Sequence, residues 1–230
     1  MNFGRGLITE ILTLGTGLRT VKIKCPANVI PPAGRFAVAN DPLDLSASLP
    51  SVLFKIADTD EGFIPVPPVP DYWKPGTYLD LVRPSGKGFK VPKTTQRLMV
   101  ISAVDHLYRL IGLINDALSE KKDVAVFTDG RVSGLSTAVE VSPFSAIPEN
   151  LQWADFLAMA VDRTAISSIS SLLGVKERAS FSCPGQVLVI TEMPCAGLGE
   201  CWGCAISTRN GGQKLVCKHG PVFDLFELDW

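Results

Sequence analysis

The sequence has little net charge and little histidine, and both shortages narrow the range of possible functions. Its 230 residues include 22 lysines and arginines and 23 aspartates and glutamates, for a formal net charge of -1. Because no basic run is present, nucleic acid is not an expected partner. The two histidines, His106 and His219, support no Ser–His–Asp or Cys–His arrangement, so a hydrolytic site is not expected either.

The sequence also lacks a long uncharged apolar run. Its most apolar helical stretch, residues 96–118, is interrupted by Asp105 and Arg109 and is too charged to span a bilayer. The first fifteen residues carry Arg5 and Glu10 and do not have the pattern of a signal peptide. We therefore expect a cytoplasmic protein without a membrane span, in a compartment that keeps thiols reduced.

The pattern of apolar residues changes near Gln96. Upstream, residues 17–26, 34–40 and 51–59 form short alternating or β-branched runs between turn signals, which predicts an all-β region. Downstream, apolar strands are expected at 97–102, 123–129 and 185–192, with a possible strand within 136–147. Helices are expected at 105–121 and over most of 153–174. This strand–helix–strand order predicts a parallel sheet with covering helices.

Four of the six cysteines lie close together near the C-terminus. They follow the spacing C-x5-C-x2-C-x12-C and are Cys195, Cys201, Cys204 and Cys217. An iron–sulfur cluster needs four thiolates that converge inside a tightly folded loop. Gly197, Gly199 and Gly203 suit such a loop, because glycine permits positive φ and lets backbone N–H groups approach sulfur.

A structural zinc site with four cysteine ligands is the alternative for this segment. Zinc sites more often show two C-x2-C pairs, so the asymmetric spacing favours iron–sulfur over zinc. A Rieske-type centre would need two histidines near the cysteines, and only His219 qualifies. The remaining cysteines, Cys25 and Cys183, are interpreted as structural residues.

Two C-terminal stretches carry a family resemblance: "MPCAGLGECWGCAI" at 193–206 and "KLVCKHGPVFDLFELDW" at 214–230. They resemble the end of the electron-transfer subunit of two-subunit dihydroorotate dehydrogenases of pyrimidine biosynthesis, in the ferredoxin-reductase-like superfamily. The resemblance implies a [2Fe-2S] cluster with all four cysteines as ligands. It extends to "KPGTYLDLVRPSGKGF" at 74–89, with Arg83 where a glycine is usual.

The same resemblance implies three parts along the chain. They are an N-terminal antiparallel β-barrel of FAD-binding type at residues 1–94, an α/β nucleotide-binding-like domain with a parallel sheet at 95–180, and a cluster-binding segment at 181–230.

Two departures from the family pattern bear on the nucleotides. The glycine-rich turn that would meet a pyrophosphate is replaced by "VISAVDHLYRL" at 100–110, which has no glycine and carries Asp105. The arginine of the flavin signature is absent from the matching region, 46–58. The sequence thus predicts that NAD binding is lost, and it argues against FAD.

The leading hypothesis is a non-catalytic electron-transfer subunit with a [2Fe-2S] cluster. The resemblance implies a hetero-oligomer with a flavin-containing, dihydroorotate dehydrogenase-like catalytic subunit. Two alternatives stay open at this point: a reductase subunit that holds both FAD and the cluster, and a zinc-stabilised scaffold without a redox role.

Overall fold

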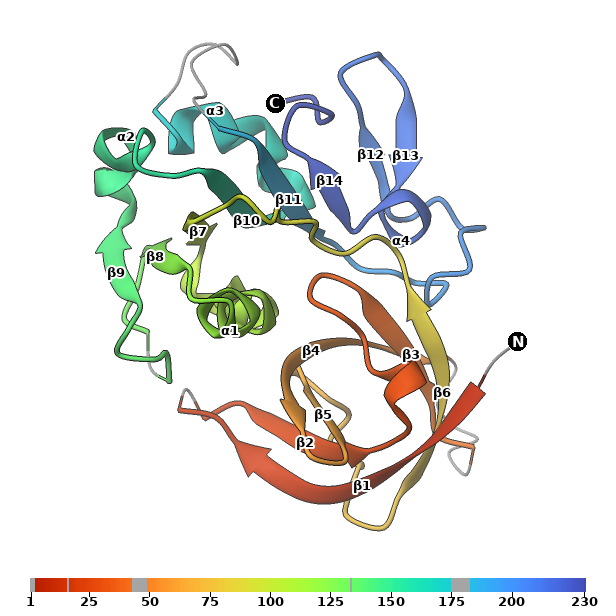
Figure 1. Ribbon diagram of the computed structural model, residues 1–230. Coiled ribbons are helices and arrows are strands. Elements are labelled where there is room, and N and C mark those ends of the chain that lie inside the picture. The colour runs from red at the N-terminus through yellow and green to blue at the C-terminus, as the bar shows by residue number, and fades with distance from the viewer. Residues whose placement is uncertain (1–2, 16, 43–48, 133, 175–182) are drawn as a thin grey trace.

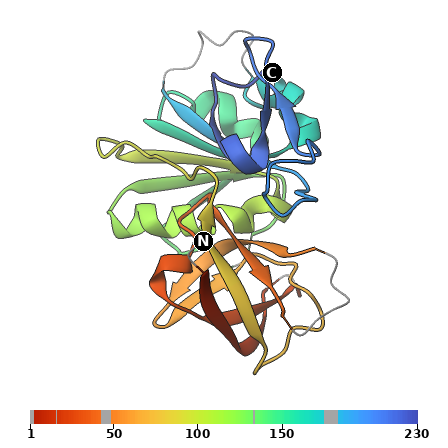
Figure 2. The same ribbon diagram turned by 90° about the vertical axis from the view of Figure 1, so that its right-hand side faces the viewer.

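The computed structural model describes residues 3–15, 17–42, 49–132, 134–174 and 183–230 (Figure 1). Within these ranges, no helix is long and apolar enough to cross a membrane. A closed barrel and an open sheet, each of six strands, form most of the fold, and Figure 2 shows the barrel on one side of the molecule and the open sheet on the other.

The N-terminal strands close into a six-stranded antiparallel barrel in the order β1-β2-β5-β4-β3-β6, as predicted. Val21 and Ile23 on β2 point inward and are fully buried, as the period-two pattern of that strand requires. The barrel strands are β1 (Phe3–Thr13), β2 (Arg19–Lys24), β3 (Phe36–Asn40), β4 (Ser51–Thr59), β5 (Gly62–Pro65) and β6 (Tyr78–Ser85). A short 3-10 helix, η1 (Ala27–Val29), covers part of it.

The second sheet has six strands in the order β14-β11-β10-β7-β8-β9. Five of them run parallel, and β14 pairs antiparallel with β11 at the edge. The strands are β7 (Arg97–Ser102), β8 (Asp123–Thr128), β9 (Glu140–Pro143), β10 (Phe156–Asp162), β11 (Gly185–Ile190) and β14 (Val222–Asp224). The predicted fold class is therefore confirmed.

Alternate residues of the central strands face opposite sides of this sheet. On β7, Leu98 and Val100 pack toward α1 (Ile111–Ser119), which lies between the sheet and the barrel (Figure 2). Met99 and Ile101 pack on the other side, in a core shared with α2 (Ile147–Asn150), α3 (Ile169–Leu172) and the C-terminal segment. The buried apolar runs of β7, β8 and β10 follow from this coverage on both faces.

Short elements complete the fold. The 3-10 helices are η2 (Val104–Arg109), η3 (Phe144–Ala146) and η4 (Arg163–Ser168). The remaining helices and strands are α2 (Ile147–Asn150), α3 (Ile169–Leu172), α4 (Val216–His219), β12 (Ala205–Ser207) and β13 (Gln213–Leu215).

Two predicted helices differ in the structure. Over 105–121, the residues up to Arg109 form the 3-10 helix η2, and the α-helix covers only Ile111–Ser119. Most of residues 153–174 was expected to be helical, but Phe156–Asp162 form the strand β10 at the centre of the sheet. Helical turns begin only at η4. The apolar run "FLAMAV" is rich in helix-forming residues, and burial between β7 and β11 overrides that preference.

The division into three parts remains a prediction, although the strands bear on it. All barrel strands precede residue 86, and the strands of the second sheet begin at Arg97. Strands β11 and β14, which lie inside the predicted cluster segment, pair with the central sheet. The predicted boundary at 180/181 lies outside the described residues.

The connector that follows β6 is joined to the C-terminal segment by backbone hydrogen bonds. The Lys87 N–H donates to the Gly220 carbonyl at 2.5 Å, and the Val222 N–H donates to the Lys87 carbonyl at 3.3 Å. Two stretches with the family resemblance, 74–89 and 214–230, thus contact one another.

Candidate metal centre

The four predicted ligand cysteines lie in one region beyond β11. Cys195 and Cys201 belong to the loop between β11 and β12, Cys204 directly precedes β12, and Cys217 lies in α4. Cys204 and Cys217 are buried, Cys195 is half-buried and Cys201 is exposed. The region therefore has a buried side, toward the sheet core, and an open side.

The four thiols are connected by contacts between pairs. The Cys195 thiol is hydrogen-bonded to that of Cys201, and the Cys217 thiol contacts those of Cys204 and Cys195. The Cys217 N–H also points at the Cys204 sulfur, 3.5 Å away. Within the described ranges, no three His, Cys, Asp or Glu side chains are arranged as ligands of a single metal ion. The thiols thus form linked pairs and not a shell around one point.

The loop directs backbone N–H groups at the sulfur atoms. Burial alone would raise the pKa of the Cys195 thiol, but hydrogen bonds lower the pKa to about 6. The donors are the backbone of Gly199, the Cys201 side chain, and the backbone of Glu200 and Cys201. The Gly203 N–H points at the Cys201 sulfur at 3.4 Å. These contacts favour the thiolate form, which is the form that binds metal.

Positive φ angles make this loop path possible. Gly197 and Gly199 have φ of 89° and 79°, and Ala196 and Trp202 adopt 47° and 56°. Left-handed backbone is costly for residues with a side chain, and such strain is typical of functional sites. Of the three glycines predicted to shape the loop, Gly197 and Gly199 adopt positive φ, whereas Gly203 does not and instead directs its N–H at the Cys201 sulfur.

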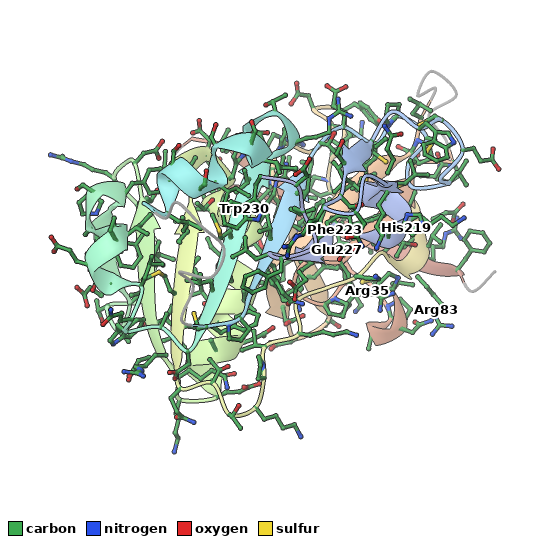
Figure 3. The ribbon with its side chains drawn as sticks, turned by 90° about the horizontal axis from the view of Figure 1, so that it is seen from above. Arg35, Arg83, His219, Phe223, Glu227 and Trp230 are labelled. Atoms are coloured by element: carbon green, nitrogen blue, oxygen red, sulfur yellow. The ribbon has the colours of Figure 1, made fainter. Side chains whose placement is uncertain are left out.

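Cys217 lies on the buried side of the group. Burial, followed by the contact with the Cys204 thiol, raises the pKa of Cys217 to about 12. His219 on the same short helix accepts a hydrogen bond from the Leu215 N–H through Nδ1 at 3.1 Å (Figure 3). This contact occupies one ring nitrogen of His219, a residue that the sequence does not predict as a metal ligand.

The barrel and the sheet both support the cysteine loop. A Cβ at Gly197 would lie 2.9 Å from the ring of Phe36, a fully buried barrel residue. From the sheet, Arg163 donates to the Gly203 carbonyl at 2.6 Å. Neither Phe36 nor Arg163 was singled out from the sequence, because both come from distant parts of the chain.

The C-terminal residues close the core beneath this loop. Phe223, Leu225 and Leu228 are buried in the same apolar cluster as Cys204 and Cys217. The indole N–H of Trp230 donates to the Leu225 carbonyl at 2.8 Å (Figure 3). By contrast, Trp202 in the loop is 58% exposed and does not fill the loop's interior.

The other predicted residues lie apart from the four thiols or serve the core. His106 Nε2, in η2, lies 2.7 Å from Oδ2 of Asp162, the last residue of β10. Cys25 packs against the barrel core, where burial raises its pKa to about 11. Cys183 is buried in the core of the sheet.

The turn after β7, where dinucleotide-binding relatives would place a phosphate, is occupied by the chain's own carboxylate. The Val104 N–H, at the start of η2, donates to Asp129 Oδ1 at 2.8 Å. Asp105 adds a second negative charge in the same turn. An anionic phosphate at this place would meet two carboxylates, and the Val104 N–H is already engaged.

In the part of the chain that the structure describes, cavities lie between the barrel and the sheet, and two of them bear on nucleotide binding or on the metal centre. The first, of about 350 Å³, is bounded by β4, η2 and the ends of β10 and β11. It is lined by Val52, Phe54, Arg109, Asp162, Ile190, Thr191, Glu192 and Met193. The Arg109 guanidinium stands 5.3 Å from the centre of the Phe54 ring. Residues 46–48 of the region compared with the flavin signature lie outside the described residues.

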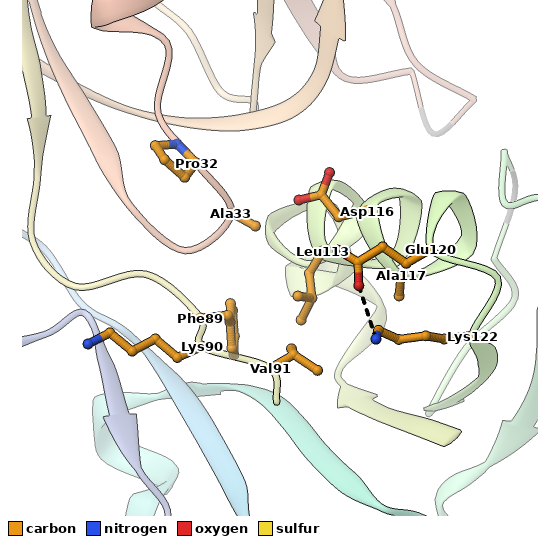
Figure 4. A pocket seen from close by; sticks show the side chains of 10 residues that line it. All are labelled: Pro32, Ala33, Phe89, Lys90, Val91, Leu113, Asp116, Ala117, Glu120 and Lys122. Atoms are coloured by element: carbon orange, nitrogen blue, oxygen red, sulfur yellow. Dashed lines mark ion pairs between the residues drawn. The ribbon is translucent and has the colours of Figure 1, made fainter. Parts of the chain in front are cut away.

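The second cavity, of about 250 Å³, lies between the β2–β3 loop, the connector and α1 (Figure 4). Lys122 and Glu120 form an ion pair of 3.0 Å at its edge, and burial raises the pKa of Asp116. None of its lining residues belongs to the cysteine segment. It is therefore not part of the candidate metal centre.

The barrel and the parallel sheet together form a ferredoxin-reductase-like fold, and the cysteine segment follows the last parallel strand of the sheet. A chain of the NADH-dependent reduced ferredoxin-NADP oxidoreductase, described for flavin-based electron bifurcation, has a similar fold. Its TM-score is 0.74 at 16% identity, over 98% of this chain and 90% of that one. The ferredoxin reductase in carbazole 1,9a-dioxygenase, in an FAD apo form, gives 0.58 at 18% identity, over 78% and 66%.

Sequence comparison identifies more specific relatives. Residues 191–229 match the family described as the iron–sulfur cluster binding domain of dihydroorotate dehydrogenase B. The chain is 25% identical over 183 residues to the electron transfer subunit of dihydroorotate dehydrogenase B (NAD(+)) from Desulforamulus reducens, with 68% of each chain covered. The resemblance inferred from the sequence is thus confirmed.

Proposed function

We propose that the chain is an electron-transfer subunit whose [2Fe-2S] cluster is held by Cys195, Cys201, Cys204 and Cys217. It relays single electrons to or from a flavin-containing dehydrogenase of dihydroorotate dehydrogenase type. The observation that carries the proposal is the linked set of thiols inside a loop that directs N–H groups at sulfur.

The pairing of the thiols supports two irons over one ion. A [2Fe-2S] cluster takes four cysteines, two on each iron. Cys195 contacts Cys201, and Cys204 contacts Cys217, so each pair is already together. When bound, the cluster supplies one-electron chemistry, and the loop's N–H···S contacts tune its reduction potential.

The open side of the loop supports a protein partner. Leu198 is 75% exposed and Trp202 is 58% exposed, and both flank the exposed Cys201. Large apolar side chains left in water beside a redox site favour burial against another protein. We propose this loop as the face that meets the catalytic subunit, with Trp202 near the centre of the contact.

The site of NAD and the site of FAD differ in how well they are preserved. The Asp129 cap on the Val104 N–H supports the loss of NAD binding. For FAD, the cavity of about 350 Å³ favours a second candidate, a relay that also holds a flavin between β4 and the ends of β10 and β11. Arg109 and Phe54 are the residues there that would contact an aromatic, anionic ligand.

Anaerobic purification followed by metal analysis and a visible spectrum tests the proposal. We expect a red-brown protein with about two irons per chain, and flavin released on denaturation would support the second candidate. A colourless protein with about one zinc would leave the zinc-stabilised scaffold instead. Replacing Trp202 by Ser should leave the iron content unchanged and weaken binding of the catalytic subunit about thirtyfold, as for an aromatic hot spot of about 2 kcal/mol.

A further inference from the structure

Arg163 links the central sheet to the cysteine loop. It is the first residue of η4, directly after β10, and its Nη1 donates to the carbonyls of Gly203 at 2.6 Å and Ala205 at 3.4 Å. Gly203 lies between Cys201 and Cys204, and Ala205 directly follows them. The guanidinium therefore holds the backbone of the C-x2-C pair from the side of the sheet.

The base of this arginine is rigid. β10 lies between β7 and β11, and its residues Phe156–Val161 are all buried. After Arg163, Ile166 and Ile169 are buried in the same core as Cys204. A side chain anchored on both flanks in this way has a defined position relative to the loop, although its own tip is exposed.

The charge of Arg163 has a consequence for a redox centre at this place. Reduction adds one negative charge, and a fixed positive charge nearby stabilises the reduced form more than the oxidised form. The acidic residues Glu192 and Glu200 lie in the same segment and act in the opposite sense, as does Asp162 beside Arg163. Lys218 packs close to Gly199 and acts in the same sense as Arg163.

Resting on the proposed function, we infer that Arg163 is a positioning residue for the Cys201–Cys204 pair and that its charge raises the reduction potential of the cluster. Because the guanidinium is exposed and screened, the effect is modest. Loss of this charge should lower the ratio of reduced to oxidised cluster about threefold at a fixed potential. This corresponds to a reduction potential ~28 mV lower, at 59 mV per factor of ten for one electron.

The test compares Arg163→Gln with Arg163→Lys in the purified full chain. The control is Arg209→Gln, which removes another exposed arginine, from the turn between β12 and β13. Iron content and visible absorbance report whether the cluster is present, and a redox titration followed by electron paramagnetic resonance gives the potential.

Arg163→Gln should hold iron, and its reduction potential should be ~28 mV lower, the equivalent of a threefold change in the ratio of reduced to oxidised cluster. The potential of Arg163→Lys should lie between that of Arg163→Gln and that of the wild type, and the potential of Arg209→Gln should match the wild type. A fully loaded Arg163→Gln protein with the wild-type potential would overturn the inference, as would an equal shift in Arg209→Gln. If Arg163→Gln fails to retain iron, Arg163→Lys decides: unchanged potential and unchanged rate of iron loss refute the role. A wild-type protein without iron would instead sink the proposed function itself.

Discussion

A single methyl group added at Gly86 should disturb the turn that follows Cys217. It lies in the connector after β6 with φ of +75°. A Cβ there would lie 2.6 Å from Pro221 Cδ and 2.7 Å from the Gly220 carbonyl oxygen. Both atoms belong to the turn that follows Cys217, so Gly86→Ala pushes directly on the segment that carries the fourth ligand.

The chain offers a matched control in Gly211. It has φ of +73°, and a Cβ there would meet nothing within 4 Å. Left-handed backbone costs an alanine about 1–2 kcal/mol at either position. Overlap with a packed neighbour adds about 1–3 kcal/mol at Gly86 alone. We therefore expect Gly86→Ala to lower the free energy of unfolding by ~2–5 kcal/mol and Gly211→Ala by ~1–2 kcal/mol.

Urea unfolding of both variants, with iron analysis after anaerobic loading, measures the difference. The Gly86→Ala protein should also lose iron faster, because the displaced turn directly follows the helix that carries Cys217. Free energies that agree within about 0.5 kcal/mol, the usual range for neutral surface changes, would refute the argument from contact. Equal iron retention in the two variants would refute its link to the metal centre.

Three further changes separate ligands from supports. Cys204→Ser should abolish stable iron binding, whereas Cys183→Ser should retain the wild-type iron content, because Cys183 lies in the core; equal losses by metal analysis would contradict the ligand set. Asp155 accepts hydrogen bonds from the Arg97 side chain and from backbone N–H groups of β7 and its approach, which lower its pKa to about 2. Since this folded pKa lies below the ordinary value, its stabilisation is present above about pH 4 and is lost as pH falls through about 2. Asp155→Asn should therefore lower the thermal midpoint at neutral pH and converge with the wild type in acid; a constant difference across that range would count against the ion pair as the cause.

The cysteine group shows what a sequence pattern is able to predict. The spacing of the four cysteines and the glycines between them indicated a loop wrapped around sulfur, and the structure has N–H groups of that loop directed at the thiols. Local residues make these contacts, so local sequence carried the signal. The identity of the bound metal is not a local property of the fold, and it stays a prediction that metal analysis must test.

The sequence pattern did not predict contacts between segments that lie far apart in the chain. β10 was expected to be helical because its alanines, methionine and leucine favour helix, and only its place between two parallel strands makes it a strand. Arg163 and Phe36 were missed for the same reason. Each meets the cysteine loop from an element far away in sequence, and an isolated arginine or phenylalanine has no distinguishing context.

The bonds between Lys87 and residues 220–222 also affect the order in which the protein is completed during synthesis. The barrel, and most of the sheet, emerge from the ribosome before the segment that holds the connector in place. Until β14 is made, the edge of β11 has no neighbour on that side, and unpaired edges invite pairing with other chains. Residues 217–224 follow the barrel and the other sheet strands in the chain, so their synthesis adds the fourth cysteine, covers the edge of β11 and joins the connector at one stage.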